Sequence, residues 1–191
     1  MNGIAKGEPM MKTLPAMTVI VLLLTGMAAD FFSVIPVVSN QRTIEVPEEY
    51  QTIQEAINNA SSGNIICVSK GTYSEHLTIT KDDLRLIGED PDTTIIDGNQ
   101  TGTVVTVSAN NVTVTGFTVR RSDEYGYGFY LYNSNDTVIA NNTCDNCDVG
   151  ISLKHSSNNK IIGNTISNNG LGIILAVGST HNLIDSNTVT N

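Results

Sequence analysis

The sequence predicts an all-β protein, a right-handed parallel β-helix of about six coils with a short N-terminal capping helix. Three observations lead to this fold class: motifs that recur about every 22 residues, apolar side chains that alternate within short strand-like runs, and an amphipathic segment ahead of the repeats. Asn, Thr, Ser and Gly are abundant in the second half, which suits short strands joined by tight turns.

The repeat is clearest in the second half of the chain. Asn142, Asn164 and Asn187 each open an Asn-Thr dipeptide, and their spacing is nearly constant. One unit cannot bury its own apolar face, so units must stack with like residues about 4.8 Å above one another. We therefore expect an asparagine side-chain ladder at a turn; the alternative is that these residues serve only as turn formers. A second ladder is expected from Ser134, Ser156 and Ser179.

Upstream of residue 128 the units are less regular. The strand-like runs are residues 65–68, 77–79, 84–87, 94–96 and 104–107. Val114 and Val119 match the strand columns at a wider offset than the later units, because the turn at 120–127 is longer than the turns that follow. The segment from residue 64 to residue 191 amounts to roughly six coils at about 22 residues each.

A helix is predicted just before the first repeat. Thr52 and Glu55 have the spacing of a capping box, and Ile53, Ala56 and Ile57 lie on one helical face. We expect this helix to cover the N-terminal end of the core. Without a cover, the first coil would expose apolar side chains and unpaired strand edges.

Charge and composition limit the location and the partners of the chain. With 10 basic and 19 acidic residues the formal net charge is −9, so no basic surface for phosphates is expected and nucleic acid is excluded as a partner. Residues 1–40 hold an uncharged apolar stretch at 14–29, preceded by lysines. We predict a cleaved signal peptide or a retained membrane anchor there, followed by the β-helix domain at 41–191. The expected location is extracellular, cell-surface or periplasmic.

The predicted β-helix domain has no recognisable C-terminal cap. The repeat runs to the last residue without a closing helix or a polar coil. The last coil is therefore expected to present an open edge. Two explanations stay open: the chain is part of a longer protein, or it associates end to end with another subunit.

A resemblance to the pectin-lyase-like superfamily is carried by four segments. They are residues 52–57 (TIQEAI), 70–73 (KGTY), 86–88 (LIG) and 94–98 (TIIDG). The later Asn-Thr-Ile and Gly-Ile-x-Leu units resemble the short repeats of NosD-like and carbohydrate-binding/sugar-hydrolase (CASH) domains. The resemblance covers residues 42–191 and implies a β-helix of a surface or exported protein. It implies no single activity, because this scaffold carries lyases, hydrolases, esterases and non-catalytic proteins.

Three acidic residues are the candidate catalytic residues: Asp123, Asp145 and Asp148. Stacked turns would bring Asp123 beside Asp148 and Arg120 beside Asp145, and carboxylates within about 5 Å could share a proton or a Ca²⁺ ion. The alternative is that they are solvated turn residues. The resemblance disfavours the known activities, because Trp and a Gly-x-x-Asp-Phe segment are absent and no acid follows Asn-Thr. That position is held by Cys144, Ile166 and Val189.

The candidate ligand-binding residues come from the long turn at 120–127 and from the next coil. All are charged or aromatic: Arg120, Arg121, Glu124, Tyr125, Tyr127 and Lys154. Aromatic faces stack on sugar rings, and charged groups orient hydroxyls or uronates. The alternative is an ordinary insertion whose tyrosines cover the adjacent coil.

Cys144 and Cys147 form the one Cys-x-x-Cys pair of the sequence. Cys144 occupies the column of Ile166 and Val189, so we interpret it as a small core residue, with a local disulfide to Cys147 as the alternative in an oxidising compartment. NosD relatives are associated with copper-enzyme maturation. Beyond residue 40, however, the chain has no Met and no clustered His, so we predict no metal site and no cofactor.

These observations favour an exported β-helix that binds carbohydrate or a cell-envelope component, or that acts as a structural or adhesion module. The alternative is a polysaccharide lyase or hydrolase acting on an acidic glycan through the three aspartates. A third hypothesis, implied by the NosD resemblance, is an accessory factor for metalloenzyme assembly.

Overall fold

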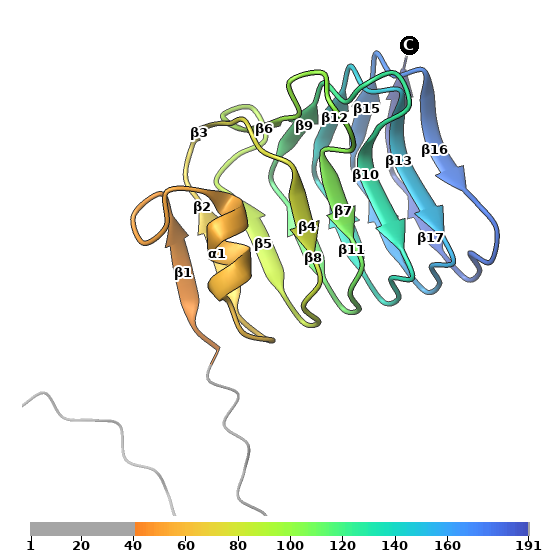
Figure 1. The fold of residues 1–191 in the computed structure, drawn as a ribbon. Helices are drawn as coiled ribbons and strands as arrows, with labels where there is room; N and C mark the ends of the chain where they lie inside the picture. Colours follow the sequence, from red (N-terminus) through yellow and green to blue (C-terminus); the bar gives the residue numbers. More distant parts are fainter. Residues whose placement is uncertain (1–40, 191) are drawn as a thin grey trace, which may run out of the picture. The chain divides into compact units, whose positions relative to one another are not determined.

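The computed structural model describes residues 41–190. The predicted signal peptide or anchor at residues 1–40 lies outside the described residues. Short strands stacked in parallel rows, with one helix, make up the described part (Figure 1). No helix within residues 41–190 is long and apolar enough to cross a membrane.

The strands belong to three parallel sheets, here called A, B and C. Sheet A consists of β1 (Thr43–Val46), β2 (Ile65–Val68), β5 (Arg85–Gly88), β8 (Thr113–Thr115), β11 (Val138–Ala140), β14 (Lys160–Ile162) and β17 (Leu183–Asp185). Sheet B consists of β3 (Gly71–Tyr73), β6 (Thr94–Asp97), β9 (Thr118–Arg120), β12 (Thr143–Asp145), β15 (Thr165–Ser167) and β18 (Thr188–Thr190). Sheet C consists of β4 (Leu77–Ile79), β7 (Val105–Val107), β10 (Tyr127–Tyr132), β13 (Val149–Lys154) and β16 (Leu171–Leu175).

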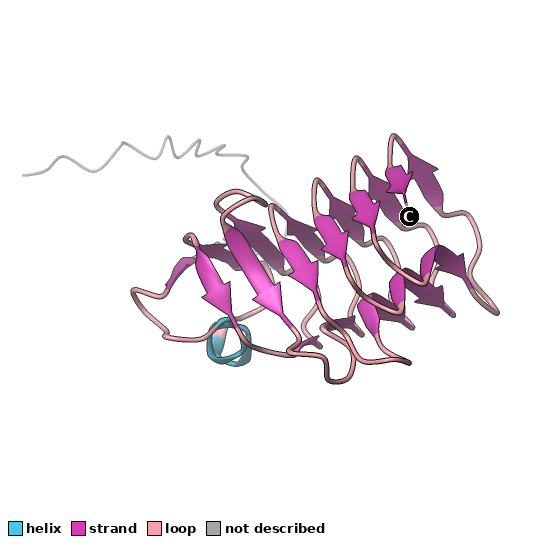
Figure 2. Ribbon diagram, turned by 90° about the horizontal axis from the view of Figure 1, so that it is seen from above, coloured by secondary structure: helices cyan, strands magenta, loops and turns pink. Residues whose placement is uncertain are grey.

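Each coil contributes one strand to sheets A, B and C in that order. Five coils are complete, from β2-β3-β4 to β14-β15-β16, and β17 and β18 begin a sixth. Figure 2 shows the same rows of strands from above, with the helix at one end of the rows. The predicted β-helix of about six coils is therefore confirmed.

The core is built from columns of like residues, one per coil. In sheet B, Ile96 pairs with Val119, which is followed in register by Cys144 and Ile166, and all four are fully buried. The wider offset predicted for Val119 is confirmed by its register with Cys144. Burying a Val, Ile or Leu side chain stabilises the fold by about 1.5–3 kcal/mol, so the columns supply most of the driving force.

Gly128 and Gly150 show why the repeated unit in the strands of sheet C begins with glycine. A Cβ atom on Gly150 would lie 2.7 Å from Ile166 Cγ2, and one on Gly128 would lie 2.1 Å from Cys144 Sγ. The side chains of the sheet B column fill this space instead. Any larger residue at the Gly position would collide with that column.

The predicted asparagine ladder is present. The Oδ1 atom of Asn164 accepts from the backbone N–H of Asn142 at 3.0 Å, and Oδ1 of Asn187 accepts from the N–H of Asn164 at 2.9 Å. The Nδ2 group of each asparagine donates to a backbone carbonyl of the preceding coil. Since water is excluded there, these amides satisfy backbone groups of the turn between sheets A and B.

The serine column also forms a ladder, since Ser134 N–H donates to Ser156 Oγ and Ser156 N–H donates to Ser179 Oγ. A further ladder at the same corner was not predicted: Asn159 N–H donates to Asn182 Oδ1 at 2.9 Å. Within residues 41–190 no buried side-chain nitrogen or oxygen lacks a hydrogen-bond partner.

The capping helix α1 (Ile53–Asn59) follows β1, as predicted. Its N-cap is Thr52, whose side chain accepts from the N–H of Glu55 at 3.1 Å. Ile53, Ala56 and Ile57 are buried in the core. The apolar face that the sequence predicts is therefore the face that packs.

Side chains from the first complete coil hold α1 over the edge of sheet C. The carboxylate of Glu75 accepts from the N–H groups of Ile53 and Gln54, and Lys81 Nζ donates to carbonyls at the end of the helix. The amide of Gln54 pairs with both backbone groups of Thr78 in the edge strand β4. The helix thus occupies the place of another strand and protects the edge.

At the other end of the stack, the last described coil leaves apolar side chains in solvent. Every residue of β17 and β18 is exposed. The large apolar side chains exposed in this region are Leu171, Leu175, Val177, Leu183, Ile184 and Val189.

Candidate binding face on sheet C

Three tyrosines of β10 form a row on the outer face of sheet C. Phe129 and Leu131 point into the core, so alternation along the strand directs Tyr130 and Tyr132 outward. The rings of Tyr127 and Tyr130 are stacked with centroids 4.7 Å apart, and those of Tyr130 and Tyr132 with centroids 5.9 Å apart. We call these three residues the tyrosine row.

The neighbouring coil adds charged and polar groups to one end of the row. Tyr132 pairs in register with Lys154 of β13, and both side chains are exposed. The imidazole of His155 meets the Tyr132 ring edge-on, with centroids 6.2 Å apart. An ammonium group therefore stands one strand away from the exposed phenol.

Tyr130 lies in the middle of the row, half-buried between the two other rings. Burial raises the pKa of its phenol, and the neighbouring Tyr127 and Tyr132 raise it further. The phenol thus stays protonated near neutral pH and can both donate and accept hydrogen bonds. Thr106 and Ser152, its partners in register, add hydroxyl side chains on either side along the stack.

The stacking of the rings determines what the row can bind. The faces between neighbouring rings are occupied by each other, so the row presents ring edges and phenol hydroxyls to solvent. Such a surface suits a ligand that is rich in hydroxyls. A free ring face for stacking is offered by Tyr125 of the long turn, which is 80% exposed.

Two of the predicted binding residues are committed to an internal ion pair. Arg120 Nε lies 2.9 Å from Asp97 Oδ2, and Arg121 Nη1 lies 3.3 Å from the same oxygen. Burial alone would raise the pKa of Asp97, but hydrogen bonds from the Asn99 backbone and from Arg120, with both arginine charges, lower it below its ordinary value. Through Asp97, the two arginines connect the long turn to the preceding coil.

The rest of the long turn is organised by Asp123. Its carboxylate accepts from the N–H of Gly102 at 2.9 Å and from the N–H of Tyr125 at 3.1 Å. Glu124 and Tyr125 are exposed. Asp123 thus shapes the turn that presents the two side chains.

The carboxylates of Asp123 and Asp148 have contacts in different coils. Asp123 is directed to the preceding coil, whereas Asp148 Oδ1 lies 3.0 Å from where a Cβ of Gly170, in the following coil, would be. Asp145 pairs in register with Arg120 as predicted, but its carboxylate accepts from Ser167 and Asn168. A catalytic role for the three aspartates stays a prediction.

The described residues contain no ready-made metal centre. Within 41–190, no group of three or more His, Cys, Asp and Glu side chains is arranged to hold a metal ion. Cys144 and Cys147 are both buried, which agrees with the interpretation of Cys144 as a core residue.

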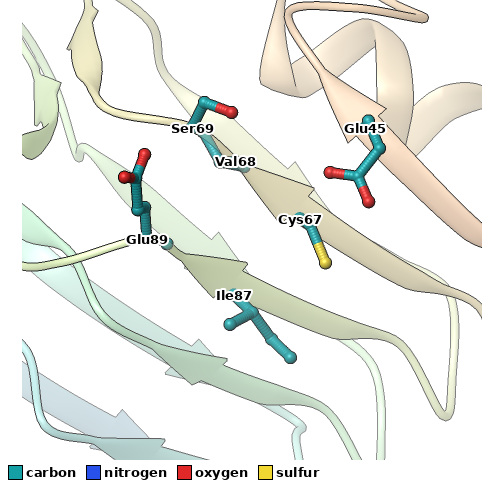
Figure 3. A pocket seen from close by; sticks show the side chains of 7 residues that line it. Glu45, Cys67, Val68, Ser69, Ile87 and Glu89 are labelled. Carbon is teal, nitrogen blue, oxygen red and sulfur yellow. The ribbon is translucent and has the colours of Figure 1, made fainter.

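A hollow on the outer face of sheet A lies between β1, β2 and β5 (Figure 3). The thiol of Cys67 lies between Glu45 and Ile87, its partners in register, and Ser69 and Glu89 border one end. Burial raises the pKa of the Cys67 thiol, and the charge of Glu45 raises it further. The thiol is therefore a weak nucleophile at neutral pH.

Comparison with known proteins places this fold in a family. Residues 33–191 match the family described as "Periplasmic copper-binding protein (NosD)". A "Cell surface glycoprotein" of Methanothermus fervidus is 30% identical over 140 residues, which cover 72% of this chain and 21% of that protein. The chain thus spans about a fifth of the length of this curated relative. Both comparisons support an exported β-helix protein.

Solved structures share the fold at low sequence identity. The pectin methylesterase from carrot is 13% identical with a TM-score of 0.58, over 71% of this chain and 50% of that chain. The alginate lyase from Paenibacillus sp. str. FPU-7 is 14% identical with a TM-score of 0.58, over 76% of this chain and 65% of that chain. At these identities the likeness concerns the pectin-lyase-like fold alone. Because the family match runs through the whole stack of coils, the chain belongs to the NosD family.

Proposed function

We propose that the protein is an exported β-helix module that binds carbohydrate on the outer face of sheet C. The observation that carries the proposal is the tyrosine row, in which three outward phenols are aligned on one strand beside Lys154. Export is supported by the family description and by the cell-surface relative. A surface module of this kind would attach the protein to glycans of the cell envelope.

The chemistry of the face suits a polymer of sugars. The phenol hydroxyls of the row exchange hydrogen bonds with sugar hydroxyls, while the exposed ring of Tyr125 offers an apolar face to the C–H bonds of a sugar ring. Lys154 adds a positive charge that attracts carboxylates or sulfates. Because the rings of the tyrosine row stack on one another, these three side chains need little ordering on binding.

The description of the family names copper, and the residues of this chain differ from the donors that copper uses. Copper sites use Cys, Met and His donors, and residues 41–190 contain no Met. The same residues hold no group of three His, Cys, Asp or Glu side chains arranged to bind a metal ion. The described residues therefore do not fit a resident copper site, and no copper-dependent step is assigned to them.

The proposal is tested by titrating the protein with alginate, polygalacturonate and dextran in a calorimeter. We expect binding to at least one of them, and about a tenfold loss of affinity for Tyr132→Ala, because Tyr132 is the most exposed ring of the row and an aromatic contact at a binding surface is worth roughly 1.4 kcal/mol. Tyr132→Phe removes only the hydroxyl and should lose less. Failure of all three polymers to bind, or full affinity in Tyr132→Ala, would contradict the proposal.

Charge is tested with a matched pair of lysines. Lys154 lies beside the tyrosine row, whereas Lys160 is another exposed lysine, on sheet A. Lys154→Ala should weaken binding of the two acidic polymers and reduce its salt dependence, since an exposed charge acts through screened attraction. Lys160→Ala should change neither. Equal effects of the two substitutions would show that only net charge matters.

A further inference from the structure

The thiols of Cys144 and Cys147 share one small space inside the coil. Cys144 belongs to β12, and Cys147 lies in the turn that leads to β13. A Cβ on Gly128, in the preceding coil, would lie 2.1 Å from Cys144 Sγ and 3.4 Å from Cys147 Sγ. The two sulfur atoms therefore occupy the place that a side chain at residue 128 would take. Both are free thiols in the structure, and each points at a backbone carbonyl, Cys144 Sγ at Gly150 O (3.3 Å) and Cys147 Sγ at Asp145 O (3.5 Å).

The surrounding backbone holds the two cysteines in this arrangement. The amide of Asn169, in the following coil, accepts from the N–H of Cys147 at 2.8 Å and donates to the carbonyl of Cys144 at 2.9 Å. In the register of β9, β12 and β15, Cys147 has the same turn position as Ser122 and Asn169 of the adjacent coils. The neighbouring coils thus place a hydroxyl or an amide where this coil places a second thiol.

The two thiols differ in acidity. The adjacent Cys144 side chain lowers the pKa of Cys147 against the opposing effect of burial, and contacts with Ser122 lower it further. The adjacent Cys147 side chain and burial together raise the pKa of Cys144 well above its ordinary value. Cys147 also lies in the turn and is slightly exposed, whereas Cys144 is fully buried, so Cys147 is the first of the two thiols to meet a disulfide oxidant.

We propose that Cys144 and Cys147 are joined by a disulfide in the exported protein, closing the turn between β12 and β13. The Cys147 thiolate attacks one sulfur of an oxidant of the disulfide class and expels one thiolate from it. The Cys144 thiol then gives up its proton and attacks Cys147 Sγ, expelling the second thiolate. Two protein thiols and one oxidant disulfide become one protein disulfide and two oxidant thiols.

A Cys144–Cys147 disulfide would stabilise the turn on which the start of the long turn at residues 120–127 packs. Asp148, next to Cys147, donates its N–H to Ser122 Oγ, and Arg121 donates its N–H to the carbonyl of Asp145. The Cys144–Cys147 turn therefore packs directly on the start of the long turn. Closing this short loop also reduces the entropy of the unfolded chain.

The test counts thiols in the purified full-length chain after equilibration with oxidised and reduced glutathione. The protein is unfolded in guanidinium, labelled with iodoacetamide and weighed by mass spectrometry, before and after reduction. We expect one label before reduction, on Cys67, and three after it. Three labels before reduction, a glutathione adduct on Cys144 or Cys147, or a bond that includes Cys67 would overturn the proposal.

Two variants sharpen the result. Cys67→Ser should accept no label before reduction and two after it. In the unsubstituted chain, reduction should lower the Tm by about 3–8 °C, whereas in Cys147→Ser it should not change the Tm. If Cys147→Ser does not fold, the label count on the unsubstituted chain still decides the question. Glycan binding is not needed for any of these outcomes.

Discussion

At the level of single residues, buried amides hold the coils in register. Asn164 accepts from the N–H of Asn142, donates to the carbonyl of Ile139 and also donates to Asn187 Oδ1. Its side chain is fully enclosed, so no water could replace these partners. The spacing of the Asn-Thr dipeptides predicted that an asparagine occupies the same turn in successive coils.

Replacing Asn164 by Ala should lower the free energy of unfolding by about 2–3 kcal/mol. The substitution leaves buried backbone N–H and C=O groups without partners, and each orphaned group costs about 1–3 kcal/mol. Urea unfolding followed by circular dichroism measures the change. The control is Asn58→Ala on the exposed side of α1, which removes one solvent-exposed hydrogen bond from Gln54 and should change stability by about 0.5 kcal/mol or less. Equal losses in both variants would contradict a structural role for the ladder.

Among the secondary-structure elements, Asp97 ties strand β6 to β9 and to the long turn. Its carboxylate is almost fully buried and receives both Arg120 and Arg121, so two coils and one turn depend on a single charge. Both arginines were predicted from the sequence to be ligand-binding residues, and Asp97 was not among the predicted site residues. The register of β6 with β9, in which Asp97 pairs with Arg120, is the feature that connects them.

The lowered pKa of Asp97 predicts a loss of stability in acid. A group whose pKa is lower in the folded state stabilises the fold above its unfolded pKa, about 3.9 for Asp, and the contribution disappears as pH falls through the lower folded pKa. Asp97→Asn should cost about 1.5–3 kcal/mol at pH 7, as expected for hydrogen bonds to a charged group. Urea titrations at pH 7 and pH 3 should show a smaller difference in the variant than in the unsubstituted protein. An unchanged difference would show that other carboxylates control acid unfolding.

Across the whole described domain, the two ends of the stack differ. One end is covered by α1, whereas the other exposes apolar side chains of its last strands. The free backbone edges of β16, β17 and β18 lie beside these side chains. A second copy of the chain could pair with such an edge, because parallel stacking is how each coil already meets the next.

Two explanations stay open for this end, a continuation of the protein that covers it or a second copy of the chain, and the second explanation predicts association that depends on concentration. Sedimentation velocity at several concentrations should show a rising average mass. Val189→Lys and Ile184→Lys should each shift the distribution towards the monomer, because a charge on an exposed apolar position costs desolvation only when a partner covers it. Lys160→Ala serves as the control. A monomer at every concentration would refute this expectation.

The candidate site was predicted only in part. Tyr127 and Lys154 were identified from sequence and lie on the binding face, but Tyr130 and Tyr132 were missed. The signal was present in the alternation of the segment 129–132, in which Tyr130 and Tyr132 alternate with Phe129 and Leu131 and must therefore point to the opposite face. Whether outward rings stack on one another depends on side-chain positions that alternation alone does not specify.

The parallel β-helix, its number of coils, its helical cap, the ladder of Asn164 and the ladder of Ser156 could be derived from the amino-acid sequence, whereas the ladder of Asn159 was not predicted. This was possible because each coil repeats the same short pattern, and stacking converts a constant spacing into direct contact. Which outward side chains meet became known only from the three-dimensional arrangement. Arg85 pairs with Ile65 on one side and with Thr113 on the other, and these two steps along the chain differ in length, so no constant period identifies the neighbours in the early coils. Turns of unequal length determine how many residues separate partners in adjacent coils. They therefore also determine that Asp97 and the long turn lie next to each other.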